Sequence, residues 1–265
     1  MHIARPALCG CGSCGCSTTI KVSKSLGCLY GAQQYQYGGK NQAKIAQWGF
    51  DNLAYQEQWG HRNKAGITQG AKGVCSYRNL AVQEQYGRDN TADIAQSGQF
   101  NKAYQVQGRR YDRREGNSAT ITQSGTYNKA WQDQSKTDND TATITQTGNH
   151  NKGYQLQEPY LCLAGFNTAD ITQNGNYNKA AQRQYGEGNE ASIDQEGNFN
   201  EAYQEQYGCN NTADIAQNGS YNVAFQYQWG GCNVATITQN GCGNGACQTQ
   251  IGFKNSATVT QTSCK

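Results

Sequence analysis

The chain repeats one pattern, Asn-x-Ala-x-Ile-x-Gln-x-Gly-x-x-Asn-x-Ala-x-Gln-x-Gln, from residue 41 almost to its end. A clear copy is NTADITQNGNYNKAAQRQ at residues 167–184. The copies begin at Asn41, Asn63, Asn90, Asn117, Asp140, Asn167, Asn189, Asn211, Asn233 and Asn255. Their commonest spacing is 22 residues, and the longer steps are explained by extra residues in turns and links. A fixed period of this size predicts stacked supersecondary units, each covering the face of the next.

Within each half of the pattern, the fixed residues occupy alternate positions. Alternation predicts β-strands with one buried face, since successive side chains of a strand point to opposite sides. In the first copy, residues 41–47 form one strand and residues 52–58 form the next. The segment Gly49-Phe50-Asp51 is expected to supply the turn, because Gly accepts positive φ without steric cost. Each period therefore reads as strand, turn, strand, turn.

Two arrangements of such strands compete: antiparallel hairpins, or a coil in which each strand pairs with its counterpart one period later. The inward residues favour the coil, because it places Asn on Asn and Gln on Gln, so that their amides form hydrogen-bonded ladders. We therefore predict an all-β, cross-β solenoid of layers of about 22 residues, with two facing parallel sheets and about 4.8 Å per layer. The residues expected to form the assembly ladders are Asn167, Ile171, Gln173, Asn178, Gln182, Gln184, Gln195, Asn200, Gln206, Gln217, Asn222 and Gln228.

The pattern divides the chain into two parts. Residues 1–30 form a Cys- and Gly-rich N-terminal arm, and residues 31–265 form the solenoid. The solenoid has nine complete units from residue 41 onward, with half units at residues 31–36 and 255–261. The two half units of neighbouring subunits are expected to combine into one layer, so that uncapped edge strands template the addition of further subunits.

These slots resemble the curlin repeat, the unit of bacterial curli and related functional amyloids. The residues that match the family pattern are Asn167, Gln173, Gly175, Asn178, Ala180 and Gln184. The resemblance extends over about residues 31–261, with Asn in the first slot where the family commonly has Ser. It implies a secreted subunit that polymerises with itself into fibres of the biofilm matrix at the cell surface. It also implies secretion and nucleation proteins, and other fibres, as further partners.

Composition excludes two classes of partner. A net charge of +3 is too small to indicate nucleic acid. No run of 18 apolar residues is present, so no membrane span is predicted, and residues 1–8 contain no apolar segment typical of a signal peptide.

Four of the twelve cysteines cluster near the start of the chain. In a chain expected to be secreted, an even number of cysteines predicts disulfides, and a Zn or Cu(I) thiolate site in the cluster is the alternative. Stacked turn positions are about 4.8 Å apart, within the roughly 4.4–6.8 Å Cα range of a disulfide. Cys264 is therefore expected to bond to Cys28 of a neighbouring subunit or to Cys242 of its own chain. The disulfide candidates are Cys28, Cys264, Cys242, Cys9, Cys11, Cys14 and Cys16.

Two outward features suggest surface functions. An aromatic stripe follows the second strands, for stacking between layers or for lateral contact with filaments or substrates. Its members are Tyr55, Tyr104, Trp131, Tyr154, Tyr203 and Phe225. Outward Thr ranks, such as residues 141–145, resemble those of ice-binding solenoids and support an alternative, ice- or surface-binding function. No nucleophile–base arrangement is identifiable, so we expect no enzyme, no catalytic residue and no cofactor.

Overall fold

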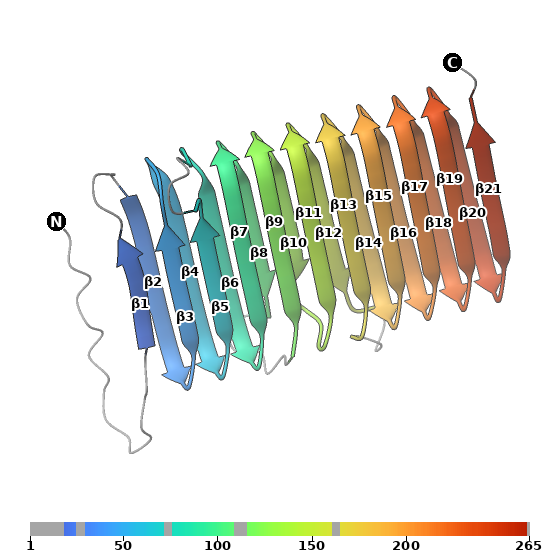
Figure 1. The fold of residues 1–265 in the computed structure, drawn as a ribbon. Coiled ribbons are helices and arrows are strands. Elements are labelled where there is room, and N and C mark those ends of the chain that lie inside the picture. Colours follow the sequence, from blue (N-terminus) through green and yellow to red (C-terminus); the bar gives the residue numbers. More distant parts are fainter. Residues whose placement is uncertain (1–18, 25–29, 72–75, 109–115, 161–164, 264–265) are drawn as a thin grey trace.

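The computed structural model describes residues 19–24, 30–71, 76–108, 116–160 and 165–263, which form two facing parallel sheets (Figure 1). The first sheet contains, in order, β1 (Thr19–Lys24), β3 (Gln42–Gln47), β5 (Lys64–Gln69), β7 (Thr91–Gln99), β9 (Ser118–Thr126), β11 (Thr141–Asn149), β13 (Thr168–Asn176), β15 (Glu190–Asn198), β17 (Thr212–Ser220), β19 (Val234–Cys242) and β21 (Ser256–Thr262). The second sheet contains β2 (Tyr30–Gly39), β4 (Asn52–His61), β6 (Leu80–Arg88), β8 (Lys102–Gln107), β10 (Lys129–Gln134), β12 (Lys152–Glu158), β14 (Lys179–Glu187), β16 (Glu201–Cys209), β18 (Val223–Gly231) and β20 (Gly245–Phe253).

Each strand pairs in parallel with its counterpart one period away, which confirms the predicted solenoid and excludes the hairpin arrangement for these strands. The register matches slot to slot: Ile171 of β13 pairs with Ile193 of β15, and Gln182 of β14 pairs with Gln204 of β16. Extra residues between copies leave this register unchanged, since β11 and β13 pair in the same way across a 27-residue step. Insertions are therefore confined to the ends of strands, where a loop does not interrupt pairing.

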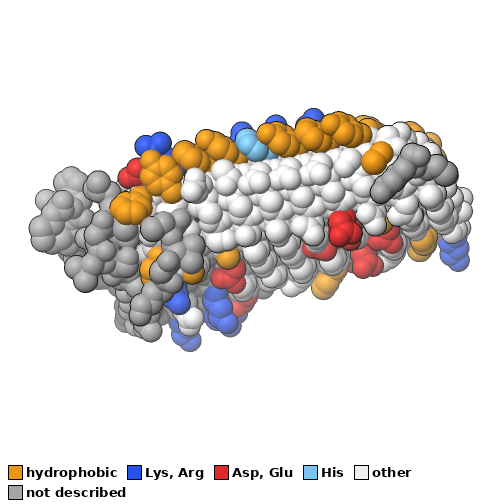
Figure 2. All heavy atoms as spheres, turned by 45° about the horizontal axis from the view of Figure 1, so that its top comes forward, with side chains coloured by type: hydrophobic (Ala, Val, Ile, Leu, Met, Phe, Trp, Pro, Cys, Tyr) orange, Lys and Arg blue, Asp and Glu red, His pale blue; other side chains and the backbone are white. Residues whose placement is uncertain are grey.

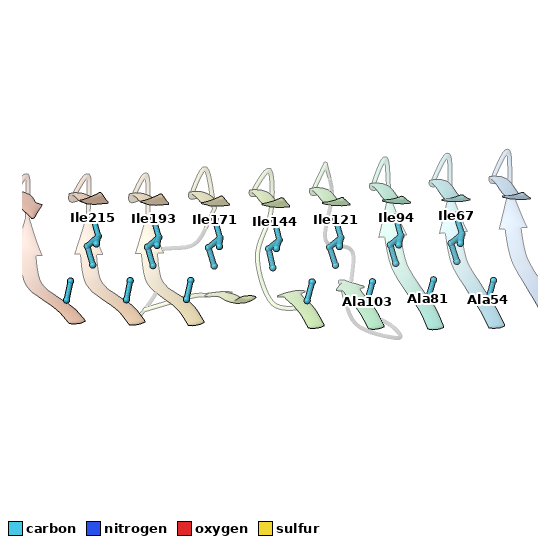
Figure 3. Packing of buried hydrophobic residues seen from close by; sticks show 14 of the residues in the cluster. Ala54, Ile67, Ala81, Ile94, Ala103, Ile121, Ile144, Ile171, Ile193 and Ile215 are labelled. Carbon is cyan, nitrogen blue, oxygen red and sulfur yellow. The ribbon is translucent and has the colours of Figure 1, made fainter. Parts of the chain in front are cut away.

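The hydrophobic core is a double row that runs along the solenoid. Ile side chains of the first sheet face Ala side chains of the second, and both rows are buried (Figure 3). One Ile and two Ala per layer bury little apolar area, at about 0.8 kcal/mol per methylene. The remaining inward positions are Asn and Gln, so amide hydrogen bonds must supply much of the cohesion between the sheets.

The predicted turn Gly49-Phe50-Asp51 lies between β3 and β4, and Asp51 adopts a left-handed conformation with φ of 53°. In the central layers the first strand continues through the Gly slot: Gly175 is paired with Gly197 within β13 and β15, and its φ is 123°. The chain reverses two residues later, at Tyr177 and Asn178, and Tyr177 adopts a left-handed conformation with φ of 59°. Gly therefore bends the strand at a corner instead of forming the whole turn.

The ladder also begins earlier than the sequence suggested. β1 (Thr19–Lys24) lies within the segment assigned to the N-terminal arm, yet it pairs in parallel with β3 as the start of the first sheet. β2 is likewise a full strand, paired with β4 over ten residues, instead of the six-residue half unit 31–36. The first sheet therefore includes residues that precede the predicted boundary at residue 30 and that do not follow the repeat pattern.

Candidate functional site

Three columns of Gln side chains run along the interior. In each column the Nε2 of one layer donates to the Oε1 of the next. Gln146 donates to Gln173 at 2.7 Å, and Gln173 donates to Gln195 at 2.8 Å. The two columns of the second sheet repeat this geometry, as in the 3.0 Å bond from Gln182 to Gln204. All amides point the same way, so each column has a direction along the solenoid axis.

In most layers the second N–H of the Gln amide binds the opposite sheet. Gln173 donates to the backbone carbonyl of Lys152 at 3.0 Å, and Gln182 donates to that of Asp170 at 2.8 Å. Gln184 does the same to Thr168 at 2.8 Å. A buried amide left without these partners would cost about 1–3 kcal/mol. The Gln columns therefore hold neighbouring layers together and also hold the two sheets together.

The Asn columns contain the amide ladder that the sequence predicted, as in the 3.1 Å bond from Nδ2 of Asn189 to Oδ1 of Asn167, and they also bind backbone groups. The backbone N–H of Asn178 donates to Oδ1 of Asn151 at 3.0 Å, and Oδ1 of Asn178 accepts from the backbone of Asn200 at 3.0 Å. Nδ2 of Asn178 donates to the carbonyl of Gly197 in the next layer at 2.8 Å. The Asn side chain therefore provides hydrogen-bond partners for the backbone N–H and carbonyl groups of the turns. This explains why the slot holds Asn, whose amide lies close to its own backbone, and not the longer Gln.

All the residues expected to form assembly ladders are buried. They are Asn167, Ile171, Gln173, Asn178, Gln182, Gln184, Gln195, Asn200, Gln206, Gln217, Asn222 and Gln228. Ile171 belongs to the hydrophobic row, and the other residues belong to the Gln and Asn columns.

One acidic residue occupies an Asn slot. Asp140 is fully buried, and its Oδ1 accepts from the backbone N–H of Asn167 at 2.8 Å. Its Oδ2 has no hydrogen-bond partner. Burial raises the pKa of Asp140 to about 7, although the nearby Thr137 hydroxyl and the bonds from Asn167 act in the opposite direction. The carboxyl is therefore a group whose charge changes near neutral pH inside the ladder.

The two ends of the solenoid expose complementary halves of the Gln columns. At the β2 end, Oε1 of Gln34 and Oε1 of Gln36 are buried and have no hydrogen-bond partner among the described residues. At the other end, Nε2 of Gln248 is buried without a partner. Gln34 and Gln248 belong to the same column, through Gln56 at one end and Gln226 at the other. One end therefore presents acceptors and the opposite end presents a donor.

The predicted aromatic stripe is present on the outer face of the second sheet, as a broken column. Tyr104 and Trp131 have ring centroids 5.7 Å apart, and Trp131 and Tyr154 are 6.5 Å apart. The second part of the column is the pair Tyr203 and Phe225, at 5.6 Å. Ala181 interrupts the column between Tyr154 and Tyr203, and Val82 separates Tyr55 from Tyr104. We call Tyr104, Trp131, Tyr154, Tyr203 and Phe225 the sheet column.

A second, more regular aromatic column was missed at the sequence level. Its rings occupy the left-handed turn position directly before the second Asn of each repeat and stack face to face, with centroids 4.6–5.0 Å apart. We call it the turn stack: Phe100, Tyr127, His150, Tyr177, Phe199 and Tyr221. Figure 2 shows a continuous hydrophobic row with a histidine in it along one edge of the molecule. An aromatic or histidine ring occupies this slot in six successive copies, which could have predicted the stack. The slot lies in a turn, outside the alternating strand positions from which the stripe was predicted.

The outward Thr ranks are interrupted by acids. Thr143 is followed by Asp170 in the next layer, and Asp194 follows Thr172. Burial raises the pKa of both Asp170 and Asp194, so neighbouring Thr side chains share their face with partly desolvated carboxyls. The rank at residues 141–145 therefore does not extend as an unbroken array.

The described cysteines, Cys209, Cys232, Cys242 and Cys247, are unpaired. Ser263 hydrogen bonds to the backbone of Cys242 in both directions, so the residue before Cys264 lies at the turn of Cys242. The remaining disulfide candidates, Cys28, Cys264, Cys9, Cys11, Cys14 and Cys16, lie outside the described residues, as does the predicted thiolate cluster. Within the described ranges, no three His, Cys, Asp or Glu side chains are grouped as metal ligands, and no helix could cross a membrane.

Comparison with protein families identifies the repeat. The model of the curlin associated repeat matches residues 115–148, 167–197 and 186–219. A search of curated protein sequences gave no match. The matched stretches lie in the central layers, between β9 and β17, and strands on both sides continue the same register.

Proposed function

We propose that this chain, whose central layers match the curlin associated repeat, is the structural subunit of an extracellular, amyloid-like fibre of a biofilm matrix. The subunits stack end to end, each adding further rungs to both sheets. Its role is mechanical and adhesive, without catalysis, and its main partner is a second copy of itself.

The observation that carries this proposal is the complementarity of the two ends. Gln248 in β20, the last strand of the second sheet, has an unused Nε2 donor, and Gln34 in β2 has an unused Oε1 acceptor in the same column. Unsatisfied buried amides and unpaired strand edges both favour addition of another chain. Because every Gln column has one direction, only head-to-tail stacking pairs donors with acceptors.

Stacking β20 on β2 of the next subunit has a consequence for the first sheet. β21 extends one layer beyond β20, since it pairs with β19 and has no described strand facing it in the second sheet. It would therefore lie opposite the next subunit's β2, in the position that β1 of that subunit occupies. The layer shared between two subunits, with β21 of one facing β2 of the next, then forms only when β1 dissociates from β3.

A disulfide at this junction would hold the subunits together after assembly. Cys264 follows Ser263, which binds Cys242. We expect Cys264 to bond to Cys28 of the next subunit, with Cys242 as the alternative partner. Non-reducing electrophoresis of denatured fibres checks this: a ladder of covalent oligomers that disappears in Cys264→Ser supports the junction, and monomers alone refute it.

The fibre itself is tested with the full-length chain. We expect unbranched filaments by electron microscopy and a repeat near 4.8 Å along the axis by fibre diffraction. Gln34→Leu should slow elongation severalfold, because it removes the acceptor at the growing interface, whereas the outward neighbour Gln33→Leu should not. A subunit that stays monomeric at high concentration contradicts the fibre, and equal elongation of the two variants contradicts the junction.

A further inference from the structure

Four lysines form a column on the outer face of the second sheet. Lys102, Lys129, Lys152 and Lys179 occupy the same register in β8, β10, β12 and β14, and all four are exposed. Lys179 lies 3.7 Å from Glu201, and the other three have no ion-pair partner among the described residues. Like charges directly opposite each other in a sheet are destabilising. The lysines of the column therefore repel one another, and a bound polyanion would offset this repulsion.

A groove runs beside this column. Its volume is about 540 Å³, and its floor is the strand backbone at Ala130, Gly153, Ala180 and Ala202. The lysines form one wall and the sheet column forms the other. Parallel stacking makes the groove straight and aligns it with the solenoid axis over six layers, from Lys102 to Phe225. One wall is therefore cationic over the four layers from β8 to β14 and continues with Glu201 in β16, and the other wall is aromatic except at Ala181.

The turn stack borders the lysines on their other side. Phe100, Tyr127, His150 and Tyr177 each precede a lysine of the column by two residues. Figure 2 shows basic side chains emerging just beyond the hydrophobic row. The basic column is thus flanked by rings on both sides, as a surface that offers charge and apolar contact together.

We infer that this groove binds a linear acidic polysaccharide, one that carries carboxylates or sulfates along its chain. Successive lysines, about 4.8 Å apart, meet the regularly spaced anionic groups of such a polymer. The apolar C–H faces of its sugar rings pack against the exposed rings of the opposite wall, where Trp131 and Phe225 are each 46% exposed. A straight, shallow groove admits a chain of any length, because both of its ends are open.

The spacing of the rings argues against a single-stranded nucleic acid. A base inserted between two rings needs about twice the 3.5 Å contact distance between stacked atoms. The centroid distances within the two columns are 4.6–6.5 Å, which leave no room for it. The one wider interval lies over Ala181, and there the Arg183 guanidinium carbon lies 5.9 Å from the Tyr154 ring and 5.7 Å from the Tyr203 ring. Arg183 closes the gap and adds a fifth positive charge beside the groove.

Binding is measured on the full-length chain with three labelled probes: polygalacturonate as a polyuronate, a neutral linear glucan, and a single-stranded oligothymidylate. We expect the polyuronate to bind most tightly and the neutral glucan not to bind. The variant Lys102→Gln, Lys129→Gln, Lys152→Gln, Lys179→Gln should bind the polyuronate at least tenfold more weakly. The matched control Lys40→Gln, Lys44→Gln, Lys64→Gln, Lys254→Gln removes the same charge from exposed sites outside the groove, and it should stay within about twofold of the parent.

A third variant, Trp131→Ser, separates a groove from simple charge attraction. It leaves the net charge unchanged and should still weaken polyuronate binding severalfold. Far-ultraviolet circular dichroism of each variant shows whether its strands are intact, and polyuronate binding is compared only among variants that keep them. Equal losses in the two quadruple variants, or no loss in Trp131→Ser, would overturn the groove. Preference for oligothymidylate that depends on the four lysines would overturn the ligand class. The groove lies within one subunit, so the soluble chain and the fibre should both bind the polyuronate. The binding result therefore tests the groove even if the chain does not polymerise.

Discussion

At the scale of single residues, Asp140 is the position where the repeat departs most sharply from its own pattern. The folded state raises its pKa from 3.8 to about 7, because its carboxyl is buried. Below about pH 4 the group is protonated in both folded and unfolded chains. As the pH rises from 4 to 7, the unfolded chain ionises first, so the free energy of unfolding falls, and above 7 the loss is complete.

Asp140→Asn should therefore stabilise the subunit at neutral pH and have little effect near pH 3. The shift corresponds to at most about 4 kcal/mol. Asn restores the amide found in the other nine copies and supplies an Nδ2 donor to the turn. Denaturation midpoints of the soluble chain at pH 3, 5 and 7.5 check this. A gain that does not depend on pH would show that the carboxyl is not the cause.

The inward amides provide the second residue-scale prediction. Gln173→Leu removes one bond accepted from Gln146 and two donated, to Gln195 and to the Lys152 carbonyl. At about 1–3 kcal/mol for each buried group left unpaired, the loss should exceed the apolar gain. Thr172→Leu, on the outward side of the same strand, is the control. Fibrillation of Gln173→Leu should be markedly slower, and equal rates would contradict the roles assigned to the two faces.

At the scale of the strand, the corner Gly is the feature that sets how closely layers approach. Gly175 has φ of 123°, and a Cβ added there would lie 1.9 Å from the carbonyl oxygen of Gly197. Gly175→Ala should therefore cost about 2 kcal/mol or more, by opening the layer between β13 and β15. Gly245→Ala is the matched control, because no atom lies within 4 Å of its added Cβ. Hydrogen exchange should show lost protection in β13 and β15 for the first variant alone, and protected strands would contradict the close approach.

At the scale of the whole molecule, the proposed end-to-end stacking would make β1 of one subunit compete with β21 of the preceding subunit for one position. β1 pairs Ile20, Val22 and Lys24 with the Ala, Ile and Gln slots of β3. β21 of a preceding subunit would place Ala257, Val259 and Gln261 there, which restores the repeat. β1 therefore acts as a poorly matched cap, and its removal should expose the interface for stacking.

Deletion of residues 1–24 should shorten the lag of fibre formation severalfold, because no strand then has to leave before β21 can pair. Deletion of residues 1–16 removes the cysteine cluster and keeps β1, so it serves as the control. Dye-binding kinetics of the two truncated chains under reducing conditions measure the difference. Similar lags would show that β1 does not compete with β21.

The sequence alone determined the strands, their buried faces, the parallel stacking and the Gln columns. It could do so because alternation identifies the buried face of a strand, and because Gln173 and Gln195 recur one period apart in the same slot. Only the tertiary structure decided how the second N–H of Gln173 crosses to Lys152, how Gly175 bends a strand, and why Tyr177 stacks in a turn. These features depend on the distance between the sheets and on the path of the corner, which a periodic pattern does not specify. The lysine groove has the same origin, since it exists only where outward side chains of several layers meet.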